Sequence, residues 1–326
     1  MSRQIVLILT HSGDYFTVDR VAEALSKRGV QPFRLDTDKF PLEVQLAVSL
    51  DNYGLTNQLK YGDQSVRQEE VQAVWMRRLW QPQMSKDLAP QFQEACARES
   101  IATLNGFLDG LENVYWLDNL ARIREAENKL RQLRVATKVG LNIPRTLVTN
   151  DPQQARQFFH KLAGKMVAKL LTPISFGMEA SSFFVYTSAV KEADLLEAEM
   201  LRHSPMVFQE QIPKLRELRV IFVAGSFFTG ALDSSRYQAK TIDWRRAQPD
   251  DCQWEEHQLP SQVTSSLTAL MAKLGLGFGA IDLIEQPNGE YVFLEVNPTG
   301  EWGMLERDLA YPISEAIAQA LLEKSS

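Results

Sequence analysis

The apolar positions at the start of the chain alternate between strand-like and helix-like spacing. Residues 5–9 form an unbroken apolar run, residues 18–28 repeat apolar side chains at helical spacing, and residues 30–36 form a second run. A strand, a helix and a strand in this order predict a parallel sheet. A further strand over 73–78 and a helix over 87–111 complete the predicted first domain.

The middle of the chain repeats this alternation less regularly. Helical spacing over residues 117–139 predicts one helix that carries the chain into the second region. That region contains four predicted strands, at residues 145–148, 166–171, 183–187 and 206–212. A charged helix is predicted at residues 191–201, before the last of these strands. Strands and helices therefore alternate along most of the chain, which is typical of mixed α/β proteins.

Near the C-terminal end, two apolar runs flank Asn288-Gly289. Both residues of this dipeptide tolerate positive φ, so it predicts a β-hairpin with a two-residue turn. Pairing the strands outward from that turn places Asp282 directly opposite Glu295. Asn297 follows two residues later and therefore lies on the same face.

This hairpin presents an electrostatic problem. Two carboxylates that face each other across a sheet repel, and burying them costs several kcal/mol unless something compensates the charge. A hard cation would do so, and Mg²⁺ favours one or two carboxylates completed by water and substrate phosphates. We therefore predict a magnesium site formed by Asp282, Glu295 and Asn297. The alternative is a hairpin rim with both acids in water.

Composition narrows the possible classes of protein. With 326 residues, 44% hydrophobic and 23% charged, the chain resembles an ordinary globular protein of two or three domains. A net charge of −6 argues against unspecific binding to nucleic acid or anionic membranes. The first apolar run is too short for a signal peptide, and Cys96 and Cys252 form no Cys-x-x-Cys motif. We expect a cytoplasmic protein.

Three cations are candidates for binding phosphate. Lys169 interrupts an apolar strand and needs an anionic partner if buried, although it could also reach water from an edge strand. Arg219 lies within a strongly apolar strand, where a permanent cation suits charge on a phosphoryl or tetrahedral acyl centre. A structural salt bridge is the alternative for Arg219. Lys129 is the weakest candidate, because a solvated helix face is the default there.

Two further segments have the composition of a nucleotide site. Glu210, Gln211 and Ile212 end an apolar strand, where backbone groups could read an adenine edge while Ile212 packs on its ring. Residues 172–177 combine Pro, Ser and Gly between two strands, as in a lid that brings backbone N–H groups over phosphates. A strand end and a plain turn are the respective alternatives.

Taken together, these residues resemble a known family. The order of Lys169, Glu210-Gln-Ile212, Arg219, Asp282 and Glu295-Val-Asn297-Pro298 is similar to the ATP-grasp ligases from about residue 118 onward. Four other segments resemble the graspetide ligases that cyclise microviridin-type precursor peptides: Thr10-His-Ser-Gly-Asp14, Phe33 to Pro41, Val74 to Arg78 and Ile242 to Arg245. The first of these is more similar to the amide-forming branch than to the ester-forming branch.

The resemblance implies an ATP-grasp fold of mixed α/β class. Residues 1–117 would form a pre-grasp domain with a parallel sheet. Residues 118–207 would form a central subdomain with a leader-peptide site, and residues 208–326 a C-terminal subdomain with the metal site. The two subdomains would enclose ATP between them.

The resemblance also implies a reaction and a role for each candidate residue. ATP would phosphorylate a Glu or Asp side chain of the precursor's core peptide, and a Lys amine or a Ser or Thr hydroxyl of the same peptide would displace phosphate. Mg²⁺ would be held by Asp282, Glu295 and Asn297, phosphates by Lys129 and Lys169, the nucleoside by Glu210, Gln211 and Ile212, the acyl phosphate by Arg219, and the leader near Glu192 and Asp194. The resembled enzymes are commonly dimers.

Two other functions remain open at this point, one catalytic and one not. An ATP-grasp enzyme could add a free amino acid such as glutamate to a protein or a small acid. A protein that retains the nucleotide fold without chemistry is the other alternative. The presence of Asp282, Glu295, Asn297 and Arg219 argues against the second of these.

Overall fold

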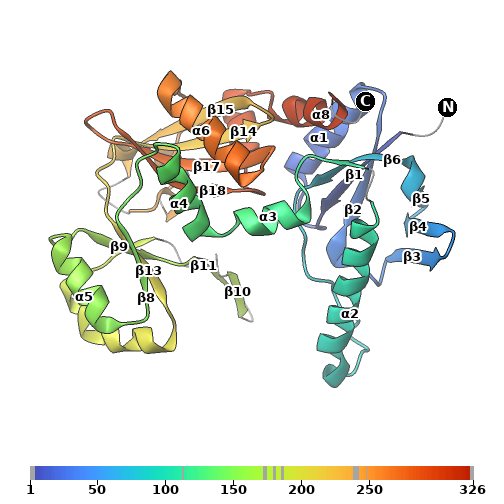
Figure 1. Cartoon of the computed structure of the whole chain (residues 1–326), viewed down its shortest axis with the longest axis horizontal. Coiled ribbons are helices and arrows are strands. Elements are labelled where there is room, and N and C mark those ends of the chain that lie inside the picture. The colour runs from blue at the N-terminus through green and yellow to red at the C-terminus, as the bar shows by residue number, and fades with distance from the viewer. Residues whose placement is uncertain are drawn as a thin grey trace.

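The computed structural model describes residues 4–111, 114–171, 175–178, 181–184, 187–237, 242–246 and 248–323. Two sheets, one near each end of the chain, lie side by side, and a smaller lobe formed by the middle of the chain extends below the C-terminal sheet in Figure 1. Within the described parts of the chain, no helix is long and apolar enough to cross a membrane.

The first sheet is parallel, as predicted. Its strands lie in the order β2-β1-β6-β7 and comprise β1 (Ile5–Thr10), β2 (Gln31–Asp36), β6 (Val71–Met76) and β7 (Tyr115–Trp116). All six residues of β1 are buried, because the strand has neighbours on both edges and helices on both faces. An antiparallel sheet of β3 (Val44–Asp51), β4 (Gly54–Tyr61) and β5 (Gln64–Arg67) adjoins it.

Helices from both ends of the chain cover this parallel sheet. Val6 and Ile8 share a core with α1 (Phe16–Lys27) and α8 (Ile313–Glu323), which lie together in Figure 1. The alternate residues of β1 share a second core with α2 (Pro90–Asp109). The last helix of the chain thus packs against the first sheet, so the N-terminal and C-terminal parts fold as neighbours.

The central lobe is built on an antiparallel sheet in the order β12-β9-β13-β8. Its elements are β8 (Thr146–Thr149), α5 (Pro152–Lys161), β9 (Met166–Lys169), β12 (Ser188–Ala189) and β13 (Met206–Glu210). A separate ribbon consists of β10 (Ser175–Met178) and β11 (Ser181–Phe184). The charged helix expected at 191–201 is a run of 3-10 turns over Glu192–His203, in which Ser204 N bonds Leu201 O three residues back.

The C-terminal sheet is antiparallel, in the order β16-β15-β14-β17-β18. Its strands are β14 (Arg216–Val223), β15 (Ser226–Asp233), β16 (Glu255–Glu256), β17 (Phe278–Glu285) and β18 (Tyr291–Asn297). The apolar face of this sheet packs on α6 (Ser261–Leu274) and on α4 (Lys129–Lys138). The helix α7 (Gly303–Leu309) follows the last strand. Short 3-10 turns complete the described chain at Thr37–Lys39, Gln68–Glu70, Ser234–Arg236, Trp244–Arg246 and Pro249–Asp251.

The single helix predicted over 117–139 is wrong. The chain forms two helices there, α3 (Leu120–Ala126) and α4, because Asn128 between them is extended, with φ −67° and ψ 98°. Its side chain accepts a hydrogen bond from Arg131 N at 2.9 Å and so caps a new helix. The break makes Lys129 the first residue of α4 and turns it away from the solvated face.

The turn of the β17–β18 hairpin also differs from the prediction. Its loop has three residues, Pro287 to Gly289, since Gln286 N donates to Glu290 O at 2.8 Å and Gly289 N donates to Gln286 O at 2.9 Å. Proline favours the second position of a type I turn, and Gly289 then takes φ +83°. The pairing near the turn is therefore shifted by one residue relative to the prediction.

A β-bulge restores the predicted pairing farther along the hairpin. Asp282 pairs with Glu295, whereas Leu283 pairs with Phe293, so Leu294 is the extra residue. The expected opposition of the two carboxylates is thus present, although the turn from which it was deduced is one residue longer.

A buried carboxylate joins the first region to the C-terminal sheet. Asp118 precedes α3, and its two oxygens accept hydrogen bonds from Gly277 N at 2.7 Å and Phe278 N at 2.8 Å. These two N–H groups lie at the start of β17. Asp118 therefore fixes where the strand that carries Asp282 begins.

We predict that Asp118→Asn lowers stability. An amide has one oxygen, so one of the two backbone N–H groups loses its acceptor, at a cost of about 1–3 kcal/mol. Urea unfolding measures the difference, and the exposed Asp109→Asn provides the control. Equal unfolding free energies for the two variants would contradict the role of Asp118.

Candidate active site

Three charged side chains stand in one row across the C-terminal sheet. Arg219 of β14 pairs with Asp282 of β17, which pairs with Glu295 of β18. Arg219 Nη1 lies 3.2 Å from Asp282 Oδ1. The ion pair anticipated as an alternative role for Arg219 therefore exists, with Asp282 as its partner. In the described part of the chain, the buried Nε of Arg219 has no hydrogen-bond partner.

Lys129 reaches the same row from the start of α4. Its Nζ donates to Asn297 Oδ1 at 2.8 Å and to Val296 O at 3.0 Å, and lies 3.4 Å from Glu295 Oε2. Asn297 Nδ2 in turn donates to Glu295 Oε1 at 3.1 Å. The break between the two helices thus brings Lys129, a predicted phosphate-binding residue, next to this row and not onto the solvated helix face that was the alternative.

The cations around the row determine the charge state of its carboxylates. Burial alone would raise the pKa of Glu295, but Lys129 and Lys169 hold it at about 2. Burial raises the pKa of Asp282 to about 6, against the opposing effect of Arg219. Burial also lowers the pKa of Lys169, although Glu295 opposes this. The site therefore combines a firmly ionised carboxylate with several cations, which suits an anionic ligand bound together with a metal.

A cavity of about 170 Å³ adjoins this row. Strands of the central and C-terminal sheets supply 12 of its 25 described lining residues, and the segments that flank them supply others. It brings together eight of the predicted site residues: Lys129, Lys169, Glu210, Gln211, Ile212, Arg219, Asp282 and Glu295. The carboxylate of Glu210 binds Arg145 through two hydrogen bonds of 2.9 Å. The backbone N–H groups of Glu210 and Gln211 donate to Arg145 O at 2.9 Å and to Lys165 O at 3.0 Å.

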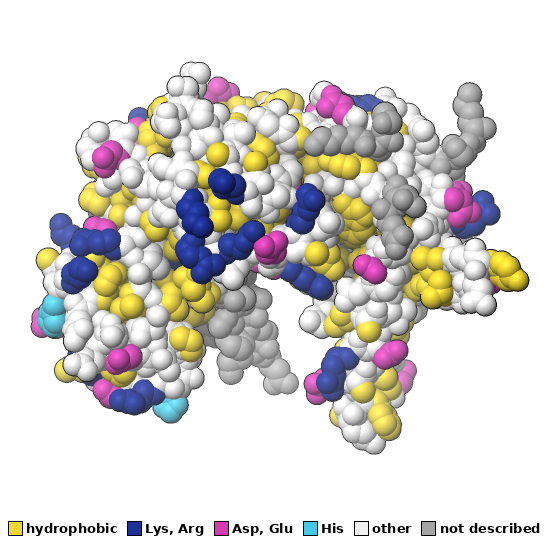
Figure 2. All heavy atoms as spheres, in the orientation of Figure 1, with side chains coloured by type: hydrophobic (Ala, Val, Ile, Leu, Met, Phe, Trp, Pro, Cys, Tyr) yellow, Lys and Arg dark blue, Asp and Glu magenta, His cyan; other side chains and the backbone are white. Residues whose placement is uncertain are grey.

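A second and larger cleft, of about 1290 Å³, opens next to the first. It shares Lys129, Arg219 and Glu295 with the smaller cavity and adds Asn297. Both spaces are also lined by Trp244, Trp254 and Arg245, whereas Arg78 and Glu301 line the cleft and not the smaller cavity. On the face shown in Figure 2, Lys and Arg side chains gather near the middle, where α3 and α4 run.

Two predicted residues lie elsewhere. Glu192 and Asp194 belong to the 3-10 segment of the central lobe and line neither the cavity nor the cleft. Asp194 Oδ2 accepts a hydrogen bond from Lys191 N at 2.8 Å, which caps that segment. The predicted lid falls partly outside the described residues, since only β10 represents it from residue 175 onward.

One buried side chain that supports the site escaped the sequence reasoning. Gln132, on α4, is 1% exposed. Its Oε1 accepts a hydrogen bond from Val296 N at 3.0 Å, while Nε2 donates to Val296 O at 2.8 Å and to Ala126 O at 2.6 Å. Gln132 therefore holds the strand segment between Glu295 and Asn297. The sequence signal for a buried Gln132 is its position beside Leu133 and four residues before Ala136, both of which belong to the apolar helical pattern.

The ligand set fits magnesium. Asp282 and Glu295 supply carboxylate oxygens, and Asn297 supplies an amide oxygen on the same side of the hairpin. Among the described residues, no group of three or more His, Cys, Asp or Glu side chains forms a metal cage. Mg²⁺ commonly takes one or two carboxylates and completes its shell with water and phosphate oxygens.

Comparisons with known proteins agree with this architecture. The MvdD pre-ATP grasp domain matches residues 5–124, and the RimK-like ATP-grasp domain matches residues 126–321. The crystal structure of macrocyclase MdnB from Microcystis aeruginosa MRC is 57% identical, with a TM-score of 0.85 over 98% of this chain and 99% of that one.

A second solved structure is similar over the same extent. The RiPP-associated ATP-grasp ligase of Chryseobacterium gregarium, in complex with ADP and a leader and core peptide, is 32% identical, with a TM-score of 0.92 over 98% of this chain and 97% of that one. Among curated proteins, the probable alpha-L-glutamate ligase of Legionella pneumophila is 24% identical over 186 residues. That match spans 56% of this chain and 59% of the length of the curated relative.

The fold and the matched domains define the class of this protein as an ATP-grasp ligase. More narrowly, the chain belongs to the RimK-like ATP-grasp family, matches an MvdD pre-ATP grasp domain over residues 5–124, and is similar over nearly its whole length to macrocyclase MdnB. The predicted fold class, a parallel-sheet domain followed by ATP-grasp subdomains, is confirmed.

We predict that Gln132→Leu destabilises the protein. Leucine fills a similar volume but leaves Val296 N–H and Ala126 C=O without this partner, at about 1–3 kcal/mol for each buried group. Urea unfolding measures the loss. The exposed Gln154→Leu on α5 is the matched control, and an equal effect of both substitutions would show that Gln132 does not clamp β18.

Proposed function

We propose that this protein is an ATP-dependent ligase that closes amide or ester cross-links within a ribosomally made precursor peptide. One observation carries the proposal: Arg219 and Glu295 border both a cavity of about 170 Å³ and a cleft of about 1290 Å³, and Asp282 between them borders the cavity. The cavity suits part of a nucleotide, and the cleft has room for a peptide segment. The similarity to macrocyclase MdnB supports the same conclusion.

ATP is the phosphoryl donor in this proposal. Lys129 and Lys169 would bind its phosphates, while Glu210, Gln211 and Ile212 would hold the nucleoside. Mg²⁺, held by Asp282, Glu295 and Asn297, would supply charge neutralisation on the phosphates. The ADP in the complex of the Chryseobacterium ligase supports a nucleotide site in this fold. The nucleotide would lie between the central subdomain, residues 118–207, and the C-terminal subdomain, residues 208–326.

The reaction has two displacements, both on the peptide. A Glu or Asp carboxylate of the core attacks the γ-phosphoryl group, the bond to ADP breaks, and an acyl phosphate forms. An amine or hydroxyl of the same peptide then attacks the acyl carbon, phosphate leaves with the electron pair, and the nucleophile loses its proton. The enzyme contributes alignment and charge, because no side chain of its own becomes acylated.

Arg219 is the residue we assign to charge stabilisation. It is a permanent cation, 8% exposed, which pairs with Asp282 through Nη1 and whose buried Nε has no hydrogen-bond partner among the described residues. In a site with little water, such a donor stabilises charge on the phosphoryl oxygens and on the tetrahedral adduct.

The precursor would bind through two segments. Its core would occupy the large cleft, and its leader would dock on the central lobe near Glu192 and Asp194. The leader and core peptide in the complex of the Chryseobacterium ligase support a substrate in two parts. The Thr10 to Asp14 motif favours amide formation from a lysine amine, and cytoplasmic synthesis of the precursor agrees with an enzyme of the same compartment.

A different ligation is the alternative. The similarity to a probable alpha-L-glutamate ligase favours the addition of free glutamate to an acceptor. The two reactions change the mass of the acceptor in opposite directions. Cyclisation removes one water for each bond, whereas ligation adds an amino-acid residue.

We predict that incubation with ATP, Mg²⁺ and the precursor encoded beside the enzyme lowers the peptide mass by one water per cross-link. Glu295→Gln should abolish this change and leave the fold intact, since it removes a charged ligand in an isosteric way. The exposed Glu290→Gln, in the same hairpin, should retain it. Intact-mass spectrometry decides, and a mass gain equal to glutamate would favour the alternative.

A second prediction concerns Arg219. Arg219→Gln should lower kcat roughly 10²–10³-fold with little change in the KM for ATP, because the lost interaction acts mainly on developing charge. Steady-state ADP release measures both constants. An increase in KM at unchanged kcat would assign Arg219 to ground-state binding.

A further inference from the structure

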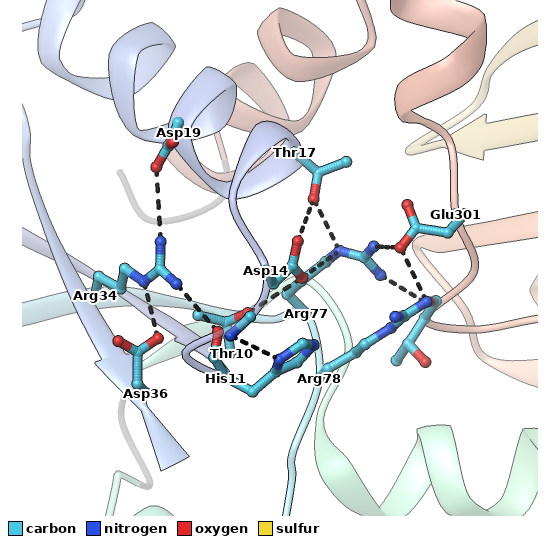
Figure 3. A network of polar contacts seen from close by, with 12 residues as sticks. Thr10, His11, Asp14, Thr17, Asp19, Arg34, Asp36, Arg77, Arg78 and Glu301 are labelled. Atoms are coloured by element: carbon cyan, nitrogen blue, oxygen red, sulfur yellow. Dashed lines mark hydrogen bonds and ion pairs between the residues drawn. The ribbon is translucent and has the colours of Figure 1, made fainter. Parts of the chain in front are cut away.

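The Thr10 to Asp14 motif and Arg77 line neither the cavity nor the cleft, yet Arg77 contacts the loop that follows Asn297, and Asp14 contacts Arg77. Figure 3 shows the contacts. Asp14 accepts hydrogen bonds from the hydroxyls of Thr10 at 3.2 Å and Thr17 at 2.9 Å. Its carboxylate is thereby oriented toward Arg77, whose Nε lies 3.3 Å away.

Arg77 is a buried cation with partners in two distant parts of the chain. Its side chain is 1% exposed, and its backbone N–H bonds Leu9 O at 2.9 Å at the end of the parallel sheet. Beyond Asp14, Nη1 donates to Thr299 O at 2.6 Å and Nη2 donates to Glu301. Because a buried guanidinium is stable only when paired, these contacts fasten the loop to the N-terminal domain.

The loop held by Arg77 folds back onto Asn297. Gly300 N donates to Asn297 O at 3.1 Å. A Cβ atom on Gly300 would lie 2.4 Å from Ala280 Cβ and 3.0 Å from Asn297 Cβ, so the loop is packed directly on this residue and its strand neighbour. Any displacement of Thr299 or Glu301 is therefore transmitted to Asn297.

Asn297 in turn sets the geometry of the charged row. Its Oδ1 accepts from Lys129 Nζ at 2.8 Å, and its Nδ2 donates to Glu295 at 3.1 Å. A chain of contacts thus runs from Asp14 through Arg77, the 299–301 loop and Asn297 to Glu295. Residues 1–117 nevertheless supply none of the described residues that line the small cavity.

We propose that Arg77 is a positioning residue for the magnesium and nucleotide site. It touches neither ligand and acts through the 299–301 loop on Asn297. The N-terminal domain would then determine how tightly the metal is held, and the Thr10 to Asp14 motif would serve to orient Arg77. This inference rests on the proposed function to the extent that Asn297 binds Mg²⁺.

The test measures Mg²⁺-dependent binding of a fluorescent ADP analogue without any peptide. Arg77→Lys keeps the charge but loses the forked contacts to Thr299 and Glu301. We expect the Mg²⁺ concentration at half-maximal binding to rise roughly 10-fold or more, the usual consequence of losing an outer partner of a metal ligand. Glu301→Gln, at a 47% exposed side chain, should shift it in the same direction.

Arg20→Lys is the matched control. Arg20 Nε lies 3.0 Å from Glu306 Oε1 and also joins the N-terminal domain to the segment after β18, but its contact lies beyond the loop that packs on Asn297. Arg20→Lys should leave the Mg²⁺ midpoint unchanged. An equal shift in Arg20→Lys would overturn the proposal, and so would parental Mg²⁺ dependence in a folded Arg77→Lys.

The remaining outcomes are also decisive. If Arg77→Lys does not fold, Glu301→Gln alone decides, and a parental midpoint in that variant overturns the inference. Nucleotide binding that needs no Mg²⁺ in the parent would refute the metal site on which the inference depends. Absence of peptide cyclisation leaves this readout unaffected, so failure of the proposed function and failure of the positioning role are distinguishable.

Discussion

The opposition of Asp282 and Glu295 across the β17–β18 hairpin is the constraint on which the site depends. Facing carboxylates destabilise a sheet, and here the sheet is surrounded by compensating cations from three directions. Arg219 arrives from the next strand, Lys129 from the start of a helix, and Lys169 from the central sheet. These cations stabilise the two carboxylates in the absence of a ligand. The carboxylates are also the groups that a metal requires, and the cations are the groups that phosphates require.

This constraint explains features of the fold that otherwise look incidental. Asn128 interrupts a helix so that Lys129 can reach the hairpin, and Gln132 one turn later holds the intervening strand segment. Asp118 fixes the beginning of the strand that carries Asp282. Each contact joins segments more than a hundred positions apart in the chain, and all of them end on the same two strands.

The sequence could predict much of this because the signals were local. Apolar runs and helical spacing gave the parallel sheet, and the alternation around Asn288-Gly289 gave a hairpin. Its carboxylate pairing was correct even though the loop is one residue longer, since a bulge at Leu294 restores the register. Apolar spacing continued through Asn128, which concealed the helix break. Arg77 could not be assigned, because its partners Thr299 and Glu301 lie 222 and 224 positions away.

Locating the metal would show directly whether the opposed carboxylates of Asp282 and Glu295 bind it. Crystals grown with ADP and Mn²⁺, a substitute for Mg²⁺ with a strong anomalous signal, would show where the cation binds. We expect an anomalous peak between Asp282 and Glu295, roughly 2.0–2.2 Å from their carboxylate oxygens, with Asn297 as a further ligand. A peak held by other residues, or ordered ADP phosphates with no metal between these two carboxylates, would contradict this assignment.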